Sequence, residues 1–363
     1  MVDMRLVVIG AGLIGTSIAL AVRAKGGQVW LADRDPASLR LAVELGAGVP
    51  LPDAGLDEPA VLAVIAVPPG AVAATLLDAQ KRGLARAYTD VASVKARPLL
   101  AAAELGCDLS TFVAGHPLAG RERSGPAAAQ ADLFLGRPWA LCPAGSSPEA
   151  VAAVTELAGV CGANPLTMDA LEHDKAVAVV SHGPHVVSAA VAARLADAED
   201  TALGLAGQGV RDVTRIAAGD PALWIGILTA NAEPVADVLD GVAGDLALAA
   251  AMLRASVESP AIAEVASGKI DELLRRGNTG RGRIPGKHGG RAREYAVVAV
   301  VIPDRPGELA RLFDAGRAAG VNIEDVSIEH SPGLPLGLAE LSVRPKEAER
   351  LTAELRTRGW SVP

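Results

Sequence analysis

Three glycines near the start of the chain have the spacing of a dinucleotide-binding loop. In "GAGLIG", Gly10, Gly12 and Gly15 follow an apolar run and open a helical pattern. Such glycines allow a tight turn and a close approach of the backbone to a pyrophosphate, which the N–H groups at the helix N-terminus stabilise. Asp33 comes 18 residues after Gly15, at the end of the next apolar run. A carboxylate there can accept hydrogen bonds from both ribose hydroxyls.

The aspartate also predicts which dinucleotide binds. A carboxylate beside the ribose would repel a 2′-phosphate, so NAD is favoured, whereas the neighbouring Arg34 leaves room for NADP. The alternative is a structural turn followed by a helix N-cap. The predicted cofactor-binding residues are Gly10, Gly12, Leu13, Ile14, Gly15, Asp33 and Arg34.

His116, in "VAGHPLAGRE", follows a later apolar run that is typical of a strand. In open α/β sheets the loops after such strands line the ligand crevice. A neutral imidazole, with a reference pKa of about 6.5, can take a hydroxyl proton while hydride leaves for NAD. Ser93 follows the preceding strand and could orient that hydroxyl, and Lys95 is either a helix-start residue or a charge beside the cofactor. A turn histidine, a helix-capping serine and a solvated lysine are the alternatives.

Two further clusters come later in the chain. In "SHGPH", His182 and His185 are three residues apart, which could place both rings on one face of a kinked helix. A metal pair is disfavoured, because no carboxylate or third histidine at ligand spacing accompanies them and nicotinamide hydride chemistry needs no metal. In "GQGVRDVTRIAAGDPALW", Arg211 and Arg215 are one helical turn apart and Trp224 follows. Paired guanidinium groups suit a dicarboxylate substrate, but two surface arginines and a core tryptophan fit equally well.

The elements that must position these residues alternate between apolar runs and helical periodicity in the first half of the chain. This pattern predicts an α/β fold, a doubly wound parallel sheet of the Rossmann type. The predicted strands are "RLVVIG", "QVWLAD", "VLAVIAV", "AYTDVA", "TFVAG" and "WALCPA". After about Asp169 the strand signals stop, and about a hundred residues read as successive helices.

The composition changes abruptly at residues 275–293, with seven Lys or Arg, six glycines and no acidic residue. This segment is predicted to be a flexible, solvated linker rather than a nucleic-acid site. Beyond it, strand, helix, strand, strand and helix patterns predict a small α+β sandwich with "WSVP" as a further strand. The predicted domains are a dinucleotide-binding domain at 1–168, a helical substrate and dimerisation domain at 169–274, the linker at 275–293, and the α+β domain at 294–363.

Composition narrows the class of protein. A length of 363 residues suggests two or three domains, and the net charge of -8 disfavours nucleic-acid binding. The apolar stretches are interrupted by Gly, Pro, His or charge, so no membrane-spanning segment is expected. The N-terminus resembles no secretory signal, so the protein is expected to be cytoplasmic. The cysteines Cys107, Cys142 and Cys161 are odd in number and form no C-x-x-C pair, which disfavours disulfides and zinc.

Taken together, these motifs carry a resemblance to a known family. "GAGLIGTSIAL", "DVASVK", "GHPLAGRE", "SHGPH" and "RDVTRIAAGDPALW", in this order and spacing, resemble the prephenate and arogenate dehydrogenases of tyrosine biosynthesis. The resemblance covers roughly residues 4 to 275. Its last three motifs are specific to that family in combination, whereas many dehydrogenases share the glycine loop.

The resemblance implies an NAD-dependent oxidative decarboxylation of prephenate to 4-hydroxyphenylpyruvate. In that family the histidine matching His116 takes the proton of the ring C4 hydroxyl while C4 gives hydride to NAD, and carbon dioxide leaves as the ring becomes aromatic. Ser93 would bind the same hydroxyl, and Arg215 would hold a carboxylate. The rest of the substrate pocket would come from Arg211, His185, Glu122 and Trp224. The helical domain would form a homodimer, and Trp224 would reach the neighbouring subunit's site.

The C-terminal "IPDRPGELARLFDAGRAAGVNIEDV" is similar to an ACT domain, a fold known for binding regulatory amino acids. This similarity implies tyrosine or another aromatic amino acid as an effector, or a role in dimerisation only. The predicted effector-binding residues are Asp304, Pro306, Gly307, Leu309, Asn322 and Ile323.

Three alternatives stay open. An arogenate dehydrogenase would act on a substrate with an amine in place of the keto group, and Glu122 could pair with that amine or organise water and arginine. An inactive amino-acid sensor is disfavoured because the glycine loop, Asp33, Ser93, His116 and Arg215 occur together. A generic hydroxyacid dehydrogenase is disfavoured by "SHGPH" and "RDVTR".

Overall fold

The computed structural model describes residues 4–119, 124–257, 259–285, 295–330 and 335–363. The chain divides into two compact units, Met1–Gly244 and Asp245–Pro363. The first unit therefore combines the sheet domain with most of the helices that were predicted to form a separate domain from residue 169.

The first unit contains a sheet with the strand order β3-β2-β1-β4-β5-β6-β7-β8. The strands are β1 (Arg5–Ile9), β2 (Gln28–Ala32), β3 (Val49–Pro50), β4 (Ala60–Ile65), β5 (Ala85–Asp90), β6 (Phe112–Pro117), β7 (Pro138–Cys142) and β8 (Asn164–Thr167). All six predicted strands and the Rossmann-type architecture are confirmed. Within the predicted parallel sheet, one pair differs, because β7 runs antiparallel to β6. The short strands β3 and β8 were not predicted.

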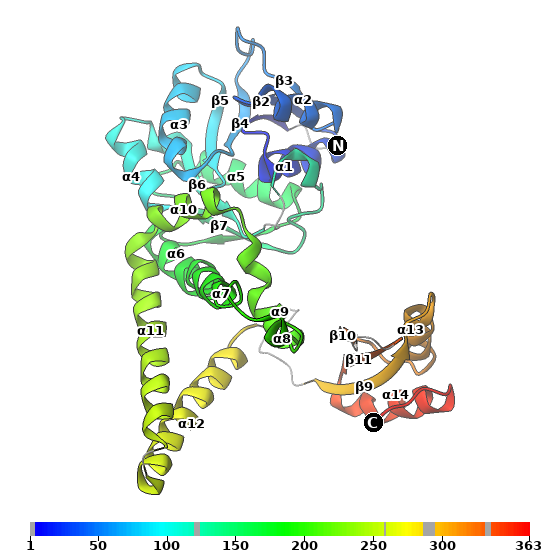
Figure 1. The fold of residues 1–363 in the computed structure, drawn as a ribbon. Helices are drawn as coiled ribbons and strands as arrows, with labels where there is room; N and C mark the ends of the chain where they lie inside the picture. Colours follow the sequence, from blue (N-terminus) through cyan, green and yellow to red (C-terminus); the bar gives the residue numbers. More distant parts are fainter. Residues whose placement is uncertain (1–3, 120–123, 258, 286–294, 331–334) are drawn as a thin grey trace. The chain divides into compact units, whose positions relative to one another are not determined.

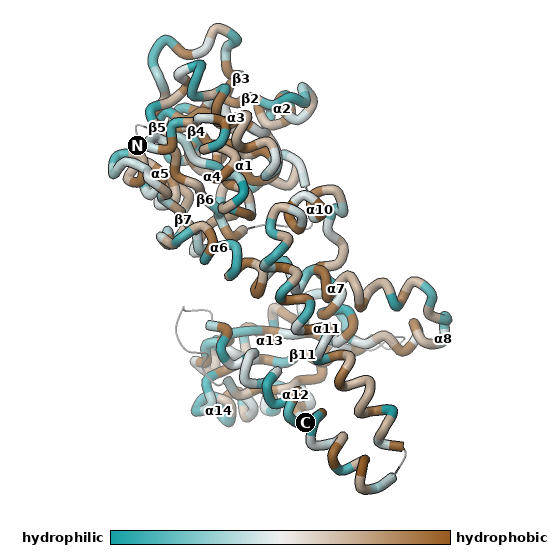
Figure 2. The backbone as a smooth tube through the Cα atoms, turned by 90° about the vertical axis from the view of Figure 1, so that its left-hand side faces the viewer, coloured by the Kyte–Doolittle hydropathy of each residue, from teal (hydrophilic) through white to brown (hydrophobic). Residues whose placement is uncertain are grey.

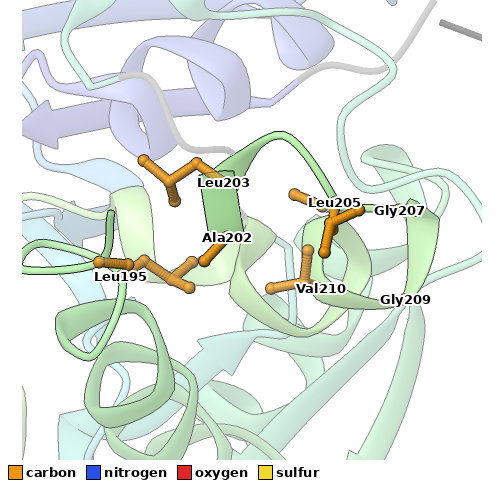
Figure 3. A pocket seen from close by; sticks show the side chains of 9 residues that line it. Leu195, Ala202, Leu203, Leu205, Gly207, Gly209 and Val210 are labelled. Carbon is orange, nitrogen blue, oxygen red and sulfur yellow. The ribbon is translucent and has the colours of Figure 1, made fainter. Parts of the chain in front are cut away.

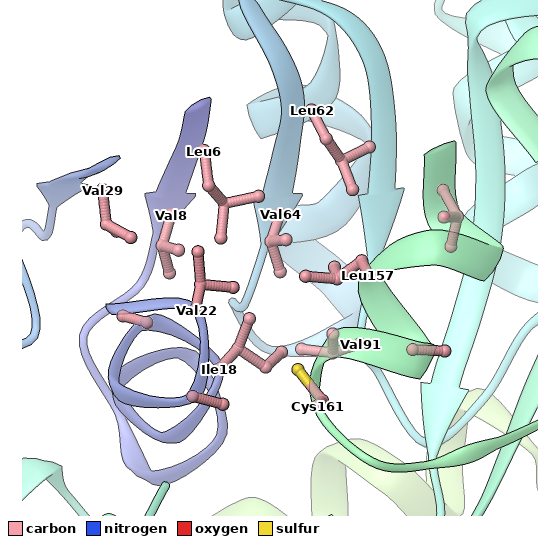
Figure 4. Packing of buried hydrophobic residues seen from close by; sticks show 14 of the residues in the cluster. Leu6, Val8, Ile18, Val22, Val29, Leu62, Val64, Val91, Leu157 and Cys161 are labelled. Carbon is pink, nitrogen blue, oxygen red and sulfur yellow. The ribbon is translucent and has the colours of Figure 1, made fainter. Parts of the chain in front are cut away.

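Helices cover both faces of this sheet (Figure 1). They are α1 (Leu13–Ala24), α2 (Pro36–Glu44), α3 (Val72–Lys81), α4 (Ala96–Glu104) and α5 (Pro148–Val160). One core places Ile18 and Val22 of α1 and Leu157 of α5 against alternate residues of β1 and β4 (Figure 4). A second core packs α3 and α4 on the opposite face. Burial on both faces explains the nearly continuous apolar runs of the central strands.

A series of helices follows the sheet. The elements are α6 (Ala170–Val177), the π turn η4 (Ala178–His182), α7 (Gly183–Ala193), α8 (Asp200–Leu203), α9 (Gln208–Thr214), the 3₁₀ turn η5 (Arg215–Ala218), α10 (Pro221–Ala230), α11 (Ala232–Ala255) and α12 (Pro260–Gly282). Further 3₁₀ turns are η1 (Pro69–Ala71), η2 (Leu109–Thr111) and η3 (Pro126–Ala128). By length and composition alone, one described stretch, Ala170–Ala193, could cross a membrane. Core helices of soluble proteins meet the same criterion, and this one contributes side chains to the site described below.

The π turn between α6 and α7 has a local cause. The N–H of Gly183 bonds to the carbonyl of Ala178, five residues earlier. Pro184, the next residue, has no N–H to donate to an α-helical ladder. Gly183 also allows α11 to approach, because a Cβ there would lie 2.6 Å from Val238. Turns of this kind occur frequently at functional sites.

Helix α12 corrects the predicted start of the linker. The helix continues to Gly282, into the segment predicted to be flexible from Arg275. Arg275 pairs with Asp271 at 2.7 Å, one helical turn away, and Arg276 pairs with Asp245 of α11. These carboxylates, which precede the basic segment in sequence, stabilise its first turns as helix. Residues 286–293 of the predicted linker lie outside the described residues.

The second unit also contains an antiparallel sheet of order β10-β11-β9. Its elements are β9 (Ala296–Pro303), α13 (Glu308–Ala318), β10 (Asp325–His330), β11 (Leu336–Val343) and α14 (Pro345–Thr357). Alternate residues of β9 are buried, as expected of a sheet with one face covered by helices. The predicted order of strands and helices is confirmed, and "WSVP" contributes a single bridge between Ser361 and Val301.

The helical part of the first unit also exposes apolar side chains. Val179 and Val180 of the π turn and Leu223 and Ile225 of α10 are exposed, and hydrophobic positions along α7 and α10 are visible in Figure 2. An apolar hollow of about 420 Å³ lies among α8, α9 and the end of α7 (Figure 3). Its lining is Leu195, Ala198, Ala202, Leu203, Leu205, Ala206, Gly207, Gly209 and Val210. With these side chains, the hollow offers no acid, base or nucleophile.

Candidate active site

A cavity of about 640 Å³ lies at the carboxyl ends of the central strands. Four groups of residues line it: the glycine loop, the loops after β4 and β5, the end of β6, and the helices on the other side. The lining is Gly12, Leu13, Ile14, Gly15, Ala66, Val67, Pro68, Pro69, Val91, Ala92, Ser93, His116, Pro117, Leu118, Ala119, Ser124, Gly125, Val177, Val180, Ser181, His182, Gly219, Asp220, Leu223, Trp224 and Ile227. The structure thus brings Ser93, His116, Trp224 and the glycine loop together.

The glycine loop fits a dinucleotide. Gly10 has φ +110°, and a Cβ there would lie 2.2 Å from the carbonyl oxygen of Ala66. A Cβ on Gly12 would meet nothing within 4 Å, so its backbone is open to a pyrophosphate. The carboxylate of Asp33 accepts the N–H of Ala11 at 2.6 Å and that of Asp35 at 2.7 Å. Each oxygen keeps a second lone pair for a ribose hydroxyl. Arg34 is exposed.

A buried ion pair fixes the loop after β5 to the strand that carries His116. Lys95 and Asp90 have fully buried side chains and pair with each other. Lys95 Nζ also donates to the Gly115 carbonyl at 2.6 Å, and Asp90 accepts the N–H of Gly115 at 3.1 Å and of Ala92 at 3.0 Å. Lys95 is the N-cap residue of α4, so its predicted position at a helix start is confirmed, but its side chain is buried in the ion pair and is neither solvated nor part of the lining of the cavity described above. The ion pair thus fixes the loop that carries Ser93 against the strand that carries His116.

His116 is linked to a second histidine. Its Nδ1 lies 2.9 Å from Nε2 of His173, on α6. Nδ1 of His173 lies 2.8 Å from Oδ1 of Asp174. Asp174 in turn accepts the N–H of Lys95 at 2.8 Å and of Ala96 at 2.9 Å, at the start of α4. A carboxylate is stabilised at a helix N-terminus, so this contact locks α6 onto the sheet domain.

The cavity histidines are neutral near pH 7. Burial lowers the pKa of His116 well below 6.5, and the charge of Lys95 acts in the same direction. Burial also lowers the pKa of His182 to about 4, against the opposing effect of Asp174. The pKa of His185 is lowered by burial as well. A neutral His116 can accept a proton at any pH above its lowered pKa.

Trp224 is positioned by the two histidines of "SHGPH". Its ring stacks on His185, with centroids 3.5 Å apart and planes at 10°, and lies edge-on to His182 at 6.2 Å. Gly219 makes room for this stack, because a Cβ there would lie 2.4 Å from Trp224 Nε1. Trp224 lines the cavity of its own chain, and its reach into a neighbouring subunit's site stays a prediction. His185 lies behind it, and His182 faces the cavity.

The predicted substrate-binding arginines do not line this cavity. Arg211 and Arg215 are exposed side chains on α9 and η5. Glu122 lies outside the described residues. The predicted effector residues lie in two groups. At the start of α13, Gly307 is the N-cap with φ +89° and Leu309 is 40% exposed. After the C-terminal end of α13, Asn322 bonds to Glu324 at 2.9 Å and Ile323 packs on the core. Asp304 donates its N–H to Pro335, and Pro306 lies in the same turn.

Four residues around the cavity were absent from the predicted site: His173, Asp174, His182 and Asn231. His182 was considered only as half of a metal pair. The sequence signal for His173 and Asp174 was "EHD" near the start of a helix, where the two polar residues are buried. Nothing in the sequence indicated that His173 lies beside His116, since the two residues are 57 positions apart.

Comparison with known proteins agrees with this geometry. Residues 18–166 match the model of the prephenate dehydrogenase nucleotide-binding domain, and residues 169–273 match that of the prephenate dehydrogenase dimerization domain. The probable prephenate dehydrogenase NovF of Streptomyces niveus is 42% identical over 358 residues, which cover 98% of both chains.

Two solved structures are also similar. Prephenate dehydrogenase from A. aeolicus, in complex with hydroxyphenyl propionate and NAD+, has a TM-score of 0.63 at 26% identity, covering 76% of this chain and 99% of that one. Synechocystis arogenate dehydrogenase has a TM-score of 0.59 at 28% identity, covering 75% of this chain and 100% of that one. The chain therefore belongs to the prephenate dehydrogenase family of NAD-dependent oxidoreductases.

Proposed function

We propose that this chain catalyses the NAD-dependent oxidative decarboxylation of prephenate to 4-hydroxyphenylpyruvate. The observation that carries the proposal is a neutral histidine, His116, facing the same cavity as the glycine loop. The 42% identity to a probable prephenate dehydrogenase over almost the full length supports prephenate as the substrate.

His116 acts as the base. Its Nδ1 is engaged by His173, so Nε2 is the nitrogen available to a substrate in the cavity. The ring C4 O–H bond of prephenate breaks and its proton moves to Nε2 of His116, while Ser93 holds the hydroxyl oxygen. The glycine loop and Asp33 would hold NAD, which would supply the acceptor for the hydride of C4. The C1–carboxylate bond breaks, its electron pair enters the ring, and carbon dioxide leaves; the resulting phenolate oxygen takes the proton back from Nε2 of His116. Aromatisation supplies the driving force.

The substrate carboxylates need cationic partners outside the described lining of the cavity. Arg215 would bind one carboxylate bidentately, and Arg211, His185, Glu122 and Trp224 would complete the pocket. The matched dimerization domain supports a homodimer. Since Arg211 and Arg215 do not line the cavity of a single chain, assembly or closure would bring them to the substrate.

The direct test mixes purified protein with NAD and either prephenate or arogenate and follows the absorbance of reduced nicotinamide. Turnover with prephenate is expected. Turnover with arogenate alone would establish the second candidate, which the similarity to Synechocystis arogenate dehydrogenase favours. Silence with both substrates, with NAD and with NADP, would overturn the proposal in favour of an inactive sensor.

Regulation by tyrosine is a second part of the proposal. The ACT-like sequence from Asp304 to Leu309 and at Asn322–Ile323 supports an aromatic amino acid as an effector of a cytoplasmic biosynthetic enzyme. Titration calorimetry of the full chain with tyrosine, phenylalanine and tryptophan should show heat with tyrosine. No heat with any of them would leave this unit without an effector role.

A further inference from the structure

The side-chain amide of Asn231 determines where His182 carries its proton. Its Nδ2 lies 2.8 Å from the main-chain oxygen of Asp174 and 3.1 Å from Nδ1 of His182. A carbonyl oxygen only accepts, so the atom facing it must be the amide nitrogen. The second N–H of that group then points to Nδ1 of His182, which must be an unprotonated acceptor. Asn231 is 3% exposed, so water does not offer an easy alternative.

The consequence for His182 is a hydrogen-bond donor toward the cavity. With a pKa of about 4, the ring is neutral near pH 7 and carries one proton. That proton is on Nε2, because Nδ1 is occupied as an acceptor. His182 lines the cavity, on the side formed by the helices.

The side chain of Asp174 imposes the opposite tautomer on His116. The carboxylate is an acceptor for two backbone N–H groups and for Nδ1 of His173, which therefore carries a proton. With its ring proton on Nδ1, His173 presents Nε2 as the acceptor, so Nδ1–H of His116 donates to it. Nε2 of His116 is then left as an acceptor toward the cavity.

We propose that His173, Asp174 and Asn231 set opposite tautomers on the two cavity histidines, making His116 an acceptor and His182 a donor that binds an oxygen of the substrate. His173, Asp174 and Asn231 are positioning residues. One aspartate serves both arms, its carboxylate through His173 and its main-chain carbonyl through Asn231. A buried polar network of this kind is rigid when every member is satisfied.

The oxygen that His182 binds belongs to a carboxylate. Among the described residues that line the cavity no side chain is cationic, and Asp220 is acidic. A neutral N–H donor is therefore one of the few groups there that stabilises an organic anion. The assignment of a carboxylate rests on the proposed function, because it depends on the identity of the substrate. The assignment of the tautomers does not depend on the proposed function.

The tautomers can be measured without turnover. The chain contains six histidines, so two-bond ¹H–¹⁵N correlation spectra of the full-length, histidine-labelled protein at pH 7.5 can resolve every ring. Single His→Gln variants assign the signals. His116 and His173 should each show a protonated Nδ1, and His182 a protonated Nε2. A protonated Nε2 on His116, a doubly protonated His173, or a protonated Nδ1 on His182 would overturn the proposal.

Asn231→Leu is the matched probe of one arm. It should release His182 into a mixture of both tautomers while the His116 signals stay unchanged. A change at His116 with none at His182 would contradict the assignment of the two arms. If this variant does not fold, the spectrum of the unaltered protein still tests the three predicted tautomers.

Kinetics with prephenate or arogenate, whichever turns over, separate donor from base. His182→Leu should raise KM for the substrate by about tenfold or more with kcat changed less than about threefold, and His182→Gln, which keeps an N–H donor, should recover much of the loss. His173→Phe should lower kcat by about tenfold or more, and His173→Gln, which keeps an acceptor, by less. Equal effects of the Leu and Gln variants would refute a donor role. Absence of turnover in the unaltered protein would refute the proposed function and leave the tautomer measurement standing.

Discussion

The two sides of the cavity are built differently. On the sheet side, the polar groups that support His116 are buried and bonded: Asp90 to Lys95, and His173 to Asp174 and to His116 itself. On the helical side, Arg211 and Arg215 are exposed and outside the lining. A base must keep one orientation and one tautomer, which requires a fixed surrounding. The arginines proposed to bind a substrate carboxylate have no such requirement before the substrate arrives.

The largest effect should come from His116 itself. His116→Asn removes the proposed base and should lower kcat by about a hundredfold or more while binding of reduced nicotinamide, measured by fluorescence, stays nearly unchanged. Near-normal turnover would show that His116 is not the base. It would also remove the proposed reason for the rigid surroundings on the sheet side of the cavity.

Breaking the buried pair should cost stability on the sheet side. Lys95→Met leaves the Asp90 carboxylate unpaired and should reduce the free energy of unfolding by about 3–5 kcal/mol, measured with urea. Arg275→Ala, in the exposed pair with Asp271, is the control and should cost less than about 1 kcal/mol. The double variant Asp90→Asn/Lys95→Met should regain part of the loss. If Lys95→Met and Arg275→Ala reduce the free energy of unfolding by similar amounts, burial of the Asp90–Lys95 pair does not increase its contribution to stability.

The histidines predict a dependence of stability on pH. His182 has a pKa of about 4 in the folded chain and about 6.5 when unfolded, so the unfolded state binds more protons between these values. The free energy of unfolding should therefore fall by up to about 3 kcal/mol as pH decreases from 6.5 to 4, and be restored as pH rises. His116 and His185 act in the same direction. In urea titrations across this range, His182→Gln should show a shallower fall; an identical slope would mean that His182 is not buried as a neutral ring.

The smallest effect tests the helical side. Arg215→Ala should mainly raise KM for the substrate, by the loss of a charged hydrogen bond of roughly 1.5–3 kcal/mol, with kcat less affected. The exposed Arg194 on the same side is the control, and Arg194→Ala should leave KM unchanged. A KM unaffected by Arg215→Ala would assign the carboxylate clamp to another residue.

The sequence predicted the sheet side in outline and missed its details. The glycine loop, Asp33 and the six long strands are local patterns, so short windows of sequence suffice to find them. The strands β3 and β8 escaped because "VP" and "NPLT" contain proline and too few β-branched residues. The start of the linker was wrong because the carboxylates that stabilise the end of α12 precede the basic segment.

Long-range contacts set the limit of the sequence analysis at the site. Lys95 was predicted to start a helix or to place a charge beside the cofactor, and only the fold shows that its side chain is buried against Asp90 and Gly115. His173 and Asn231 meet residues 57 and 49 positions away, respectively. Such contacts follow from how α6 and α10 are placed on the sheet, which no periodicity encodes.

The π turn at residues 178–182 makes the site sensitive to the length of the chain. Each residue of an α-helix advances the helix by about 100°, so the extra residue in this turn gives α6 and α7 different rotational frames. His173 and Asp174 belong to the first frame, and His185, under Trp224, to the second. Deleting one residue here would turn one set of side chains away from the other while every side chain kept its chemistry. Variants of this segment should thus tolerate substitutions that preserve size far better than a single-residue insertion or deletion.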